Sequence, residues 1–350
     1  MDSGQTDQGA GEALRAEALR QLRSTYGPAV LEGGSGGAGL YALLGHVGLL
    51  ERRCRNPVLV AASGSVGAKL RLAEALGRRE TVGLDLVAAC VNELLVQGAL
   101  PLFFLAHLAG GGADSAGSLQ IVKGIAKGCR QADCALLGSG VEARGDLGAP
   151  GERHLAGFAV GMVERARLLD GPGNARPGDA VLGIASSGLH LGGFERAQRV
   201  LLGAGGLRPE EQPPELGCPL GEELLRPTRI YVRAVRALLE RYRVKGVVHG
   251  LAHVGDGGLA GSVAGVLGRR CVARIERAAV PRPPVFDLVQ RVGGLSDGEM
   301  LGTFNLGVGM VAVVAPFYAE AAIRRIRRAG DRAAVIGEVA EGSGPAVEVA

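Results

Sequence analysis

The stretch from Val58 to Gln97 places the strongest constraint on how this chain can fold. It opens with a short β-branched apolar run, Val58 to Ala61, which predicts a buried strand. The small residues from Ser63 to Lys69 predict a turn in which the backbone approaches a ligand closely. From Val82 to Gln97 the apolar residues recur at helical spacing, and Asp85 near the start of this helix complements its dipole. Many folds bind an anion with a strand, a glycine turn and a helix in this order, although the spacing of a P-loop is missing.

Composition excludes several classes of protein. The 350 residues, 47% hydrophobic and 21% charged, indicate a globular chain of one large or two ordinary domains. Six cysteines without a C-x-x-C pair predict the reduced thiols of a cytoplasmic protein and no zinc or disulfide framework. The net charge of +4 is too small and too dispersed to indicate nucleic-acid binding, and we interpret the arginines at 324–328 as a solvated helix face.

The chain also lacks signals for membranes and export. No apolar run reaches membrane-spanning length, because Pro316 and Glu320 interrupt the nearest candidate. The first eight residues are polar and acidic, which is unlike a signal or transit peptide. We expect residues 1–10 to be disordered and residues 12–23 to form a surface helix.

Strands and helices alternate in both halves of the chain, which predicts two α/β or α+β domains. A polar segment rich in glycine and proline, residues 169–179, predicts the boundary between them. We therefore expect an N-terminal tail and helix over 1–28, an N-terminal domain over 29–168 and a C-terminal domain over 169–350. The expected strands after the opening stretch are Leu102–Leu105, Cys134–Leu137, Leu155–Val163, Ala180–Ala185, Gly246–His249, Gly307–Val314 and Ala334–Val339. The expected helices are Ser118–Gln131, Arg229–Tyr242 and Tyr318–Ala329.

Several segments together resemble one enzyme family, phosphoribosylformylglycinamidine cyclo-ligase, also called aminoimidazole ribonucleotide synthetase. They follow the family's order and cover about residues 30–345, which is far more specific than any single motif. The matching segments are Val66–Ala73, Gly83–Asn92, Val96–Leu105, Gly157–Gly161, Ser186–His190, Pro227–Val232 and Thr303–Met310.

The resemblance implies a fold, a reaction and partners. The fold is a two-domain α/β architecture in which strands of the N-terminal domains form a barrel across a dimer. The reaction is the ATP- and Mg²⁺-dependent ring closure of formylglycinamidine ribonucleotide in purine biosynthesis. The implied partners are a small-molecule nucleotide and either a second copy of the chain or an active paralogue, with no nucleic acid and no membrane.

The resemblance also implies site residues. His190 and His253 match catalytic positions, and Asp85 matches the one candidate metal ligand. The positions that match nucleotide- or substrate-binding residues are Lys69, Asp85, Asn92, Gln97, Thr303 and Asn305. Each has a structural alternative: the histidines could pack in turns, Asp85 could be a helix N-terminal acid, and Lys69 could lie on the surface.

Other family positions carry side chains that cannot bind a cation. The family's turn Gly-Thr-Asp-Gly-Val-Gly-Thr-Lys places its aspartate on Gly64 and its second threonine on Ala68. Another aspartate falls on Ala106, and two glutamates of the family are replaced in the loop 138–145. Since Mg²⁺ needs oxygen ligands and phosphoryl transfer depends on charge neutralisation, we interpret the chain as a cyclo-ligase homologue with weak or no catalysis, a pseudoenzyme.

Two alternatives stay open. An active cyclo-ligase could meet its need for Mg²⁺ with Asp85, Glu93, Glu142 and Asp256. A relative in the same ATP-binding superfamily, such as thiamine-phosphate kinase, selenophosphate synthetase or a hydrogenase-maturation protein, could act on another substrate. The segments 97–105 and 303–310 favour the cyclo-ligase branch over that last alternative.

Overall fold

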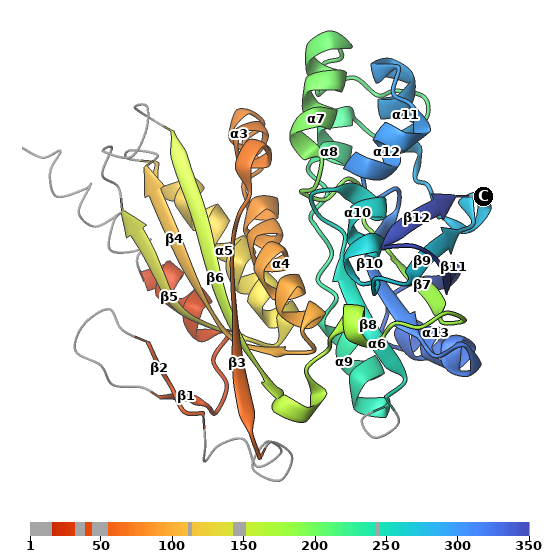
Figure 1. The fold of residues 1–350 in the computed structure, drawn as a ribbon. Coiled ribbons are helices and arrows are strands. Elements are labelled where there is room, and N and C mark those ends of the chain that lie inside the picture. The colour runs from red at the N-terminus through yellow and green to blue at the C-terminus, as the bar shows by residue number, and fades with distance from the viewer. Residues whose placement is uncertain are drawn as a thin grey trace, which may run out of the picture. The chain divides into compact units, whose positions relative to one another are not determined.

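The chain divides into two compact units, each with its own sheet (Figure 1). The computed structural model describes residues 16–31, 39–43, 55–110, 114–142, 152–242 and 246–349, without the side chains of 139–142. Unit 1 comprises Met1–Leu94 and Leu100–Ala166, and unit 2 comprises Leu95–Ala99 and Arg167–Ala350. The predicted disordered tail and the glycine-rich segment 32–38 lie outside the described residues.

Unit 1 is a four-stranded sheet with helices on one face. Its strands are β3 (Pro57–Ser65), β4 (Leu100–Gly110), β5 (Ala135–Glu142) and β6 (Arg153–Glu164), in the order β3-β6-β4-β5. Its helices are α3 (Gly67–Ala75), α4 (Glu80–Val96) and α5 (Ser115–Ala132), with a short hairpin of β1 (Val30–Leu31) and β2 (Leu40–Tyr41). Among the described strands of this sheet only β4 and β5 run parallel, and these strands do not close into a barrel. A barrel completed by a second copy therefore stays a prediction.

Glycines allow α4 and α5 to pack with their backbones in contact. A Cβ on Gly124 would lie 1.9 Å from the carbonyl oxygen of Glu80, and one on Gly83 would lie 2.4 Å from that of Ile121. No side chain fits at such distances, so both positions require glycine. Most apolar residues of α4 are buried, and Leu86 and Leu94 are 0% exposed.

Unit 2 is built on a six-stranded sheet. Its strands are β7 (Ala180–Ala185), β8 (Val248–His253), β9 (Cys271–Ile275), β10 (Val308–Val314), β11 (Ala333–Glu341) and β12 (Ala346–Val349). They lie in the order β12-β9-β11-β7-β10-β8, with only β12 and β9 parallel. The α-helices after β6 are α6 (Gly171–Asn174), α7 (Phe194–Gln198), α8 (Leu220–Leu224), α9 (Val232–Arg241), α10 (Gly258–Gly265), α11 (Pro284–Gly293), α12 (Asp297–Thr303) and α13 (Ala319–Arg328). Short 3-10 or π segments occur at Arg165–Arg167, Arg199–Ala204, Arg277–Ala279 and Pro316–Tyr318.

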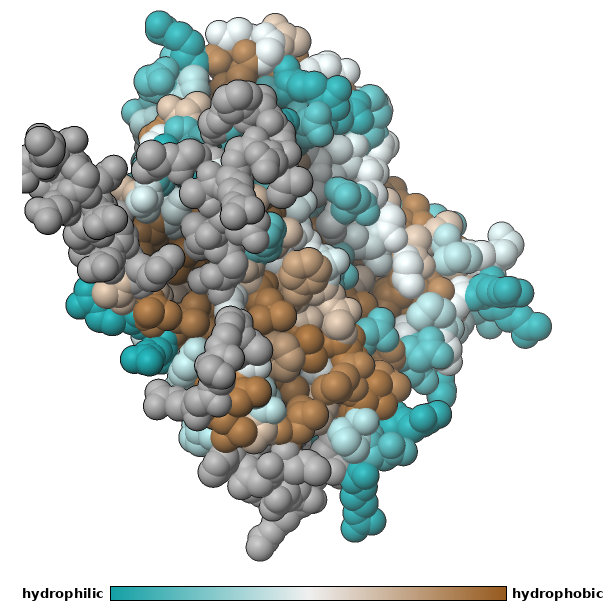
Figure 2. Space-filling view, turned by 90° about the vertical axis from the view of Figure 1, so that its left-hand side faces the viewer, coloured by the Kyte–Doolittle hydropathy of each residue, from teal (hydrophilic) through white to brown (hydrophobic). Residues whose placement is uncertain are grey.

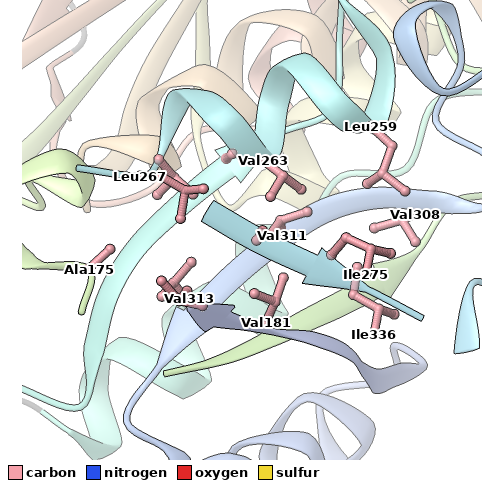
Figure 3. Close-up of a cluster of buried hydrophobic side chains, with 14 of the residues drawn as sticks. Ala175, Val181, Leu259, Val263, Leu267, Ile275, Val308, Val311, Val313 and Ile336 are labelled. Carbon is pink, nitrogen blue, oxygen red and sulfur yellow. The ribbon is translucent and has the colours of Figure 1, made fainter. Parts of the chain in front are cut away.

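The core of unit 2 lies between its sheet and α10. Leu259 and Val263 of α10, and Leu267 just after it, point toward branched side chains of the strands, among them Val311 and Val313 of β10 (Figure 3). Every residue of β10 is buried, as expected for a continuous apolar run in the middle of a sheet. None of the described helices combines the length and the hydropathy needed to cross a bilayer.

The prediction of two α/β units with alternating strands and helices is confirmed, but some local predictions were wrong. The segment Ser63–Lys69 is not a turn, because β3 continues to Ser65 and α3 begins at Gly67. The strand expected at Gly246–His249 lies at Val248–His253 instead, where it pairs with β10 through His253. The strand ending at Val339 is not the last one, because β12 adds beside β9.

Candidate nucleotide site

Lys69 and Asp85 form a completely buried ion pair in unit 1. The Nζ atom of Lys69 lies 2.9 Å from Oδ1 of Asp85, and both side chains are 0% exposed. Lys69 lies in the first turn of α3, and Asp85 lies in the second turn of α4. Burying two charges costs several kcal/mol per ion, which only close geometry offsets. The interpretations of Lys69 as a surface lysine and of Asp85 as a helix N-terminal acid were therefore wrong.

Two further predicted residues lie on or after α4. Asn92 is fully buried and follows Asp85 by two helical turns, so the two residues share a face of α4. Gln97 is exposed in the turn that follows the helix, where its carbonyl oxygen accepts a hydrogen bond from Leu169 at 3.3 Å. Gln97 belongs to unit 2, so unit 1 brings together Lys69, Asp85 and Asn92 without it.

His190 lies in a tight turn after β7 and is held by backbone groups. Its φ angle is +60°, a left-handed conformation that is uncommon for residues other than glycine, and its side chain is buried. Its Nε2 atom accepts hydrogen bonds from the backbone N–H groups of Ser187 at 3.1 Å and Arg229 at 3.4 Å. Since Nε2 serves as an acceptor, the ring is in the neutral tautomer with its proton on Nδ1. This geometry favours a positioning role for His190 over proton donation from Nε2.

Asn305 ties the same turn to the start of β10. Its Nδ2 group donates to the carbonyl oxygens of Gly188 at 2.9 Å and Leu189 at 2.8 Å. Its Oδ1 atom accepts from the N–H of Gly307 at 2.8 Å. Left-handed backbone at Leu306 and Gly307 adjoins it, and such conformations cluster at functional sites. The structure thus brings Asn305 and His190 together, as parts of one turn cluster in unit 2.

Thr303 joins a charged group that the sequence did not point to. Its hydroxyl accepts a hydrogen bond from Arg196 at 3.2 Å, and Arg196 also pairs with Glu299 at 2.6 Å. Hydrogen bonds from the backbone of Ser296 and from Arg196 lower the pKa of Glu299 to about 2. The sequence signal that could have located Glu299 is the Ser296-x-x-Glu299 capping box, and the structure contains this capping box at the start of α12.

His253 is the last residue of β8 and is half-buried opposite Met310 of β10. His253 therefore lies in the sheet, and the structural alternative that it packs in a turn was wrong. Asp256, one of the acids proposed for an alternative metal site, is exposed in the turn that follows. His253 and His190 are both in unit 2, at the ends of strands that flank β10.

The positions of the missing acids leave little room for them. A Cβ on Gly64 would lie 3.2 Å from Cβ of Ala89 and 3.3 Å from Sγ of Cys90 on α4. Ala68 and Ala106 are buried. Within the ranges that the structure describes, no three His, Cys, Asp or Glu side chains gather to hold a metal ion. Glu93 and Asp256 are exposed, and the Glu142 side chain lies outside the described atoms. The described residues therefore do not fit a protein-built Mg²⁺ site.

Comparison with known proteins places these features in a family. Family models match both halves of the chain: the N-terminal domain of AIR synthase related protein over residues 53–163, and its C-terminal domain over 176–350. The chain belongs to the AIR synthase related family.

Relatives in this family share most of the chain. Phosphoribosylformylglycinamidine cyclo-ligase of Sorangium cellulosum is 48% identical over 330 residues, covering 94% of this chain and 92% of the relative. The protein of that name from Symbiobacterium thermophilum is 49% identical, covering 85% and 84%. That from Thermoanaerobacter sp. is 38% identical, covering 92% of each. The names of these relatives favour the alternative of an active cyclo-ligase over the interpretation as a pseudoenzyme.

Solved structures confirm the fold alone. The hydrogenase maturation protein HypE of E. coli is 19% identical with a TM-score of 0.64, covering 97% of this chain and 93% of that one. Thiamine-monophosphate kinase of Stenotrophomonas maltophilia is 20% identical with a TM-score of 0.64, covering 97% and 94%. A HypE structure in complex with ATP is 22% identical with a TM-score of 0.62, covering 94% and 89%. Their identities are far below those of the cyclo-ligases, so the cyclo-ligase branch remains the better match than the alternative of a relative with another substrate.

Proposed function

We propose that the chain is an ATP-dependent cyclo-ligase that converts formylglycinamidine ribonucleotide to aminoimidazole ribonucleotide in the purine pathway of the cytoplasm. The identity of 38–49% to proteins of that name, over most of both chains, carries the proposal. ATP would transfer its γ-phosphoryl group to the formyl oxygen of the substrate. Attack of a substrate nitrogen on the activated carbon would then close the ring and release phosphate, with ADP as the other product.

The chain's own residues would contribute positioning and charge. Phosphoryl transfer depends mainly on positioning and on neutralising the developing negative charge. Lys69 is the cation at a matching family position, and its ammonium group contacts Asp85. A nucleotide phosphate that recruits Lys69 must therefore compete with Asp85 or share the ammonium group with it. In unit 2, Asn305 and His190 would hold the turn 186–190 in one conformation.

A second candidate function is a cyclo-ligase homologue that binds a nucleotide without turning it over. Two observations favour it: the closed pair of Lys69 and Asp85, and the lack of a three-ligand metal cluster among the described residues. Such a protein could act beside an active paralogue. The two candidates differ in whether they release ADP and whether nucleotide binding depends on Mg²⁺.

The test is a steady-state assay with ATP, Mg²⁺ and formylglycinamidine ribonucleotide. We expect ADP release that depends on the substrate, with a turnover on the order of 10 per second. Asp85→Asn, which keeps the shape of the side chain, should lower kcat/KM by at least about 100-fold. Glu80→Gln changes an exposed acid of the same helix and should leave the rate unchanged. A folded protein that binds ATP equally with and without Mg²⁺, and releases no ADP, would establish the second candidate instead.

The outer face of the unit 1 sheet is the surface we propose for a homodimer. Large apolar side chains are exposed there: Leu59 on β3 is 54% exposed, Phe158 on β6 is 48% exposed and Leu105 on β4 is 39% exposed. Phe158 pairs in register with Leu105, and Figure 2 shows hydrophobic residues gathered on this side. Exposed apolar patches of this kind mark protein interfaces, and the resemblance to the cyclo-ligases points to a second copy as the occupant.

We expect a dimer by size-exclusion chromatography with light scattering. Phe158→Glu should convert it to a monomer, because a buried interface would then contain an unpaired charge. Phe317→Glu makes the same change at a side chain that is 88% exposed in unit 2 and should leave the dimer intact. A monomeric native protein at micromolar concentration would contradict this proposal.

A further inference from the structure

Helices α9 and α13 of unit 2 pack side by side in opposite directions and share one outward face. Arg229, just before α9, pairs with Asp331, just after α13, at 2.7 Å. At the other end, the rings of Tyr242 and Tyr318 lie 5.6 Å apart. Apolar residues of both helices, such as Leu238 and Ile326, are buried. We call the outward side the arginine face; its members are Arg233, Arg236, Arg241, Arg324, Arg325, Arg327, Arg328 and Arg332.

The arginine face concentrates the positive charge of the chain. Its eight arginines are accompanied on the two helices by two glutamates, Glu240 and Glu320, so its net charge exceeds the +4 of the whole chain. In the sequence this charge is dispersed over two segments, residues 233–241 and 324–332, and the fold brings these segments together.

Most arginines of this face have no carboxylate partner in the described part of the chain. This holds for Arg233, Arg241, Arg324, Arg325, Arg328 and Arg332, while Arg327 donates to the carbonyl oxygen of Ala333. Some exposed arginines elsewhere in unit 2 pair with acids, namely Arg208 with Glu211, Arg274 with Glu348 and Arg277 with Asp297. A dense group of unpaired guanidinium groups repels itself unless an anion binds there.

An exposed aromatic side chain adjoins the arginine face. Phe317, in the 3-10 segment just before α13, is 88% exposed and packs edge-to-face against Tyr318, with ring centroids 5.1 Å apart. The contact from Tyr318 to Tyr242 continues this row of rings to the end of α9. Such a ring offers a flat apolar surface on which an unpaired base can stack.

We propose that the arginine face binds single-stranded nucleic acid. Guanidinium groups bind phosphate through paired hydrogen bonds, and protein surfaces for nucleic acids are much more positive than those for proteins. A protein partner is a poorer fit, because the cores of protein interfaces are depleted of charge and this face has few apolar side chains. The inference is independent of the proposed ligase reaction, whose residues lie elsewhere.

The test measures binding of labelled oligonucleotides of about 16 nucleotides, oligo(U) and oligo(dT), by fluorescence anisotropy. We expect binding that weakens steeply as salt rises from about 50 to 200 mM, since each phosphate contact releases counterions. The triple variant Arg324→Gln, Arg328→Gln, Arg332→Gln should lower the salt slope by roughly 2, and Phe317→Ala should weaken binding roughly 5- to 150-fold.

The matched control is the triple variant Arg208→Gln, Arg274→Gln, Arg277→Gln, which removes the same charge from ion-paired arginines outside the face. It should keep most of the affinity, and circular dichroism should show all variants folded. Three results would each overturn the proposal: no binding at the low-salt end, equal weakening by both triple variants, or a preference for duplex of the same sequence. Different affinities for oligo(U) and oligo(dT) would support it and identify the preferred strand.

Discussion

Asp85→Ala is expected to lower the free energy of unfolding by about 3–5 kcal/mol. The substitution removes the carboxylate that lies 2.9 Å from the ammonium group of Lys69, while that group stays at 0% exposure in the folded protein. A buried charge without its counter-ion destabilises far more than a surface pair contributes. Urea denaturation followed by circular dichroism measures the change.

Two further variants test whether the loss of stability results from the burial of the ion pair. Glu80→Ala removes the partner of Lys127 at the start of the same helix, where both side chains are 50% exposed, and should cost less than about 1 kcal/mol. The double variant Lys69→Met, Asp85→Leu removes both charges and should be more stable than Asp85→Ala alone. Equal losses in the free energy of unfolding for Asp85→Ala and Glu80→Ala would show that the buried pair contributes no more to stability than the exposed pair.

Gly124→Ala is expected to destabilise the protein by about 3 kcal/mol or more, the upper end of what overpacking costs. The new methyl group would lie 1.9 Å from the carbonyl oxygen of Glu80, so α5 would have to move away from α4 along their whole contact. The atoms that the methyl group would meet belong to the backbone of Glu80 and Gly83, so no side chain can rotate to make room. The midpoint of urea denaturation, or the yield of folded protein where the loss is complete, reports the effect.

The control for Gly124 is a helical glycine with open space around it. A Cβ on Gly261 of α10 would meet nothing within 4 Å. Gly261→Ala should therefore stabilise the protein slightly, by about 0.5–1 kcal/mol, because alanine loses less chain entropy than glycine in a helix. A similar loss of stability in both variants would mean that the contact between α4 and α5 is not the cause.

Elements with a strong local pattern could be predicted from the sequence. The strand β7 was predicted with the bounds it has, because its apolar run ends at polar Asp179 and Ser186. The short helix α3 was missed, because its small residues and glycines resemble a turn. The helix α12 was also missed, although the capping box formed by Ser296 and Glu299 is a signal in the sequence for its start.

The predicted site residues were harder to interpret, because their surroundings depend on distant segments. The charges of Lys69 and Asp85 are visible in the sequence, but their burial follows from the tertiary fold, which brings α3 and α4 into contact. Arg196 contacts Thr303 from 107 positions away, a contact that no local pattern indicates. The backbone N–H of Arg229 donates to the Nε2 atom of His190 from 39 positions away, a contact that the sequence likewise does not indicate.

The division of the chain has a consequence for how the protein is made. Leu95–Ala99 belongs to unit 2 although unit 1 surrounds it in the sequence, and Leu95 and Ala99 are fully buried. During synthesis this short piece leaves the ribosome long before Leu169, which binds the carbonyl oxygen of Gln97. It cannot make its contacts within unit 2 until the later half of the chain has been synthesised. A fragment that begins at Arg167 would lack this piece and the hydrogen bond from Leu169 to Gln97, so we expect it to be less stable than unit 2 within the full chain.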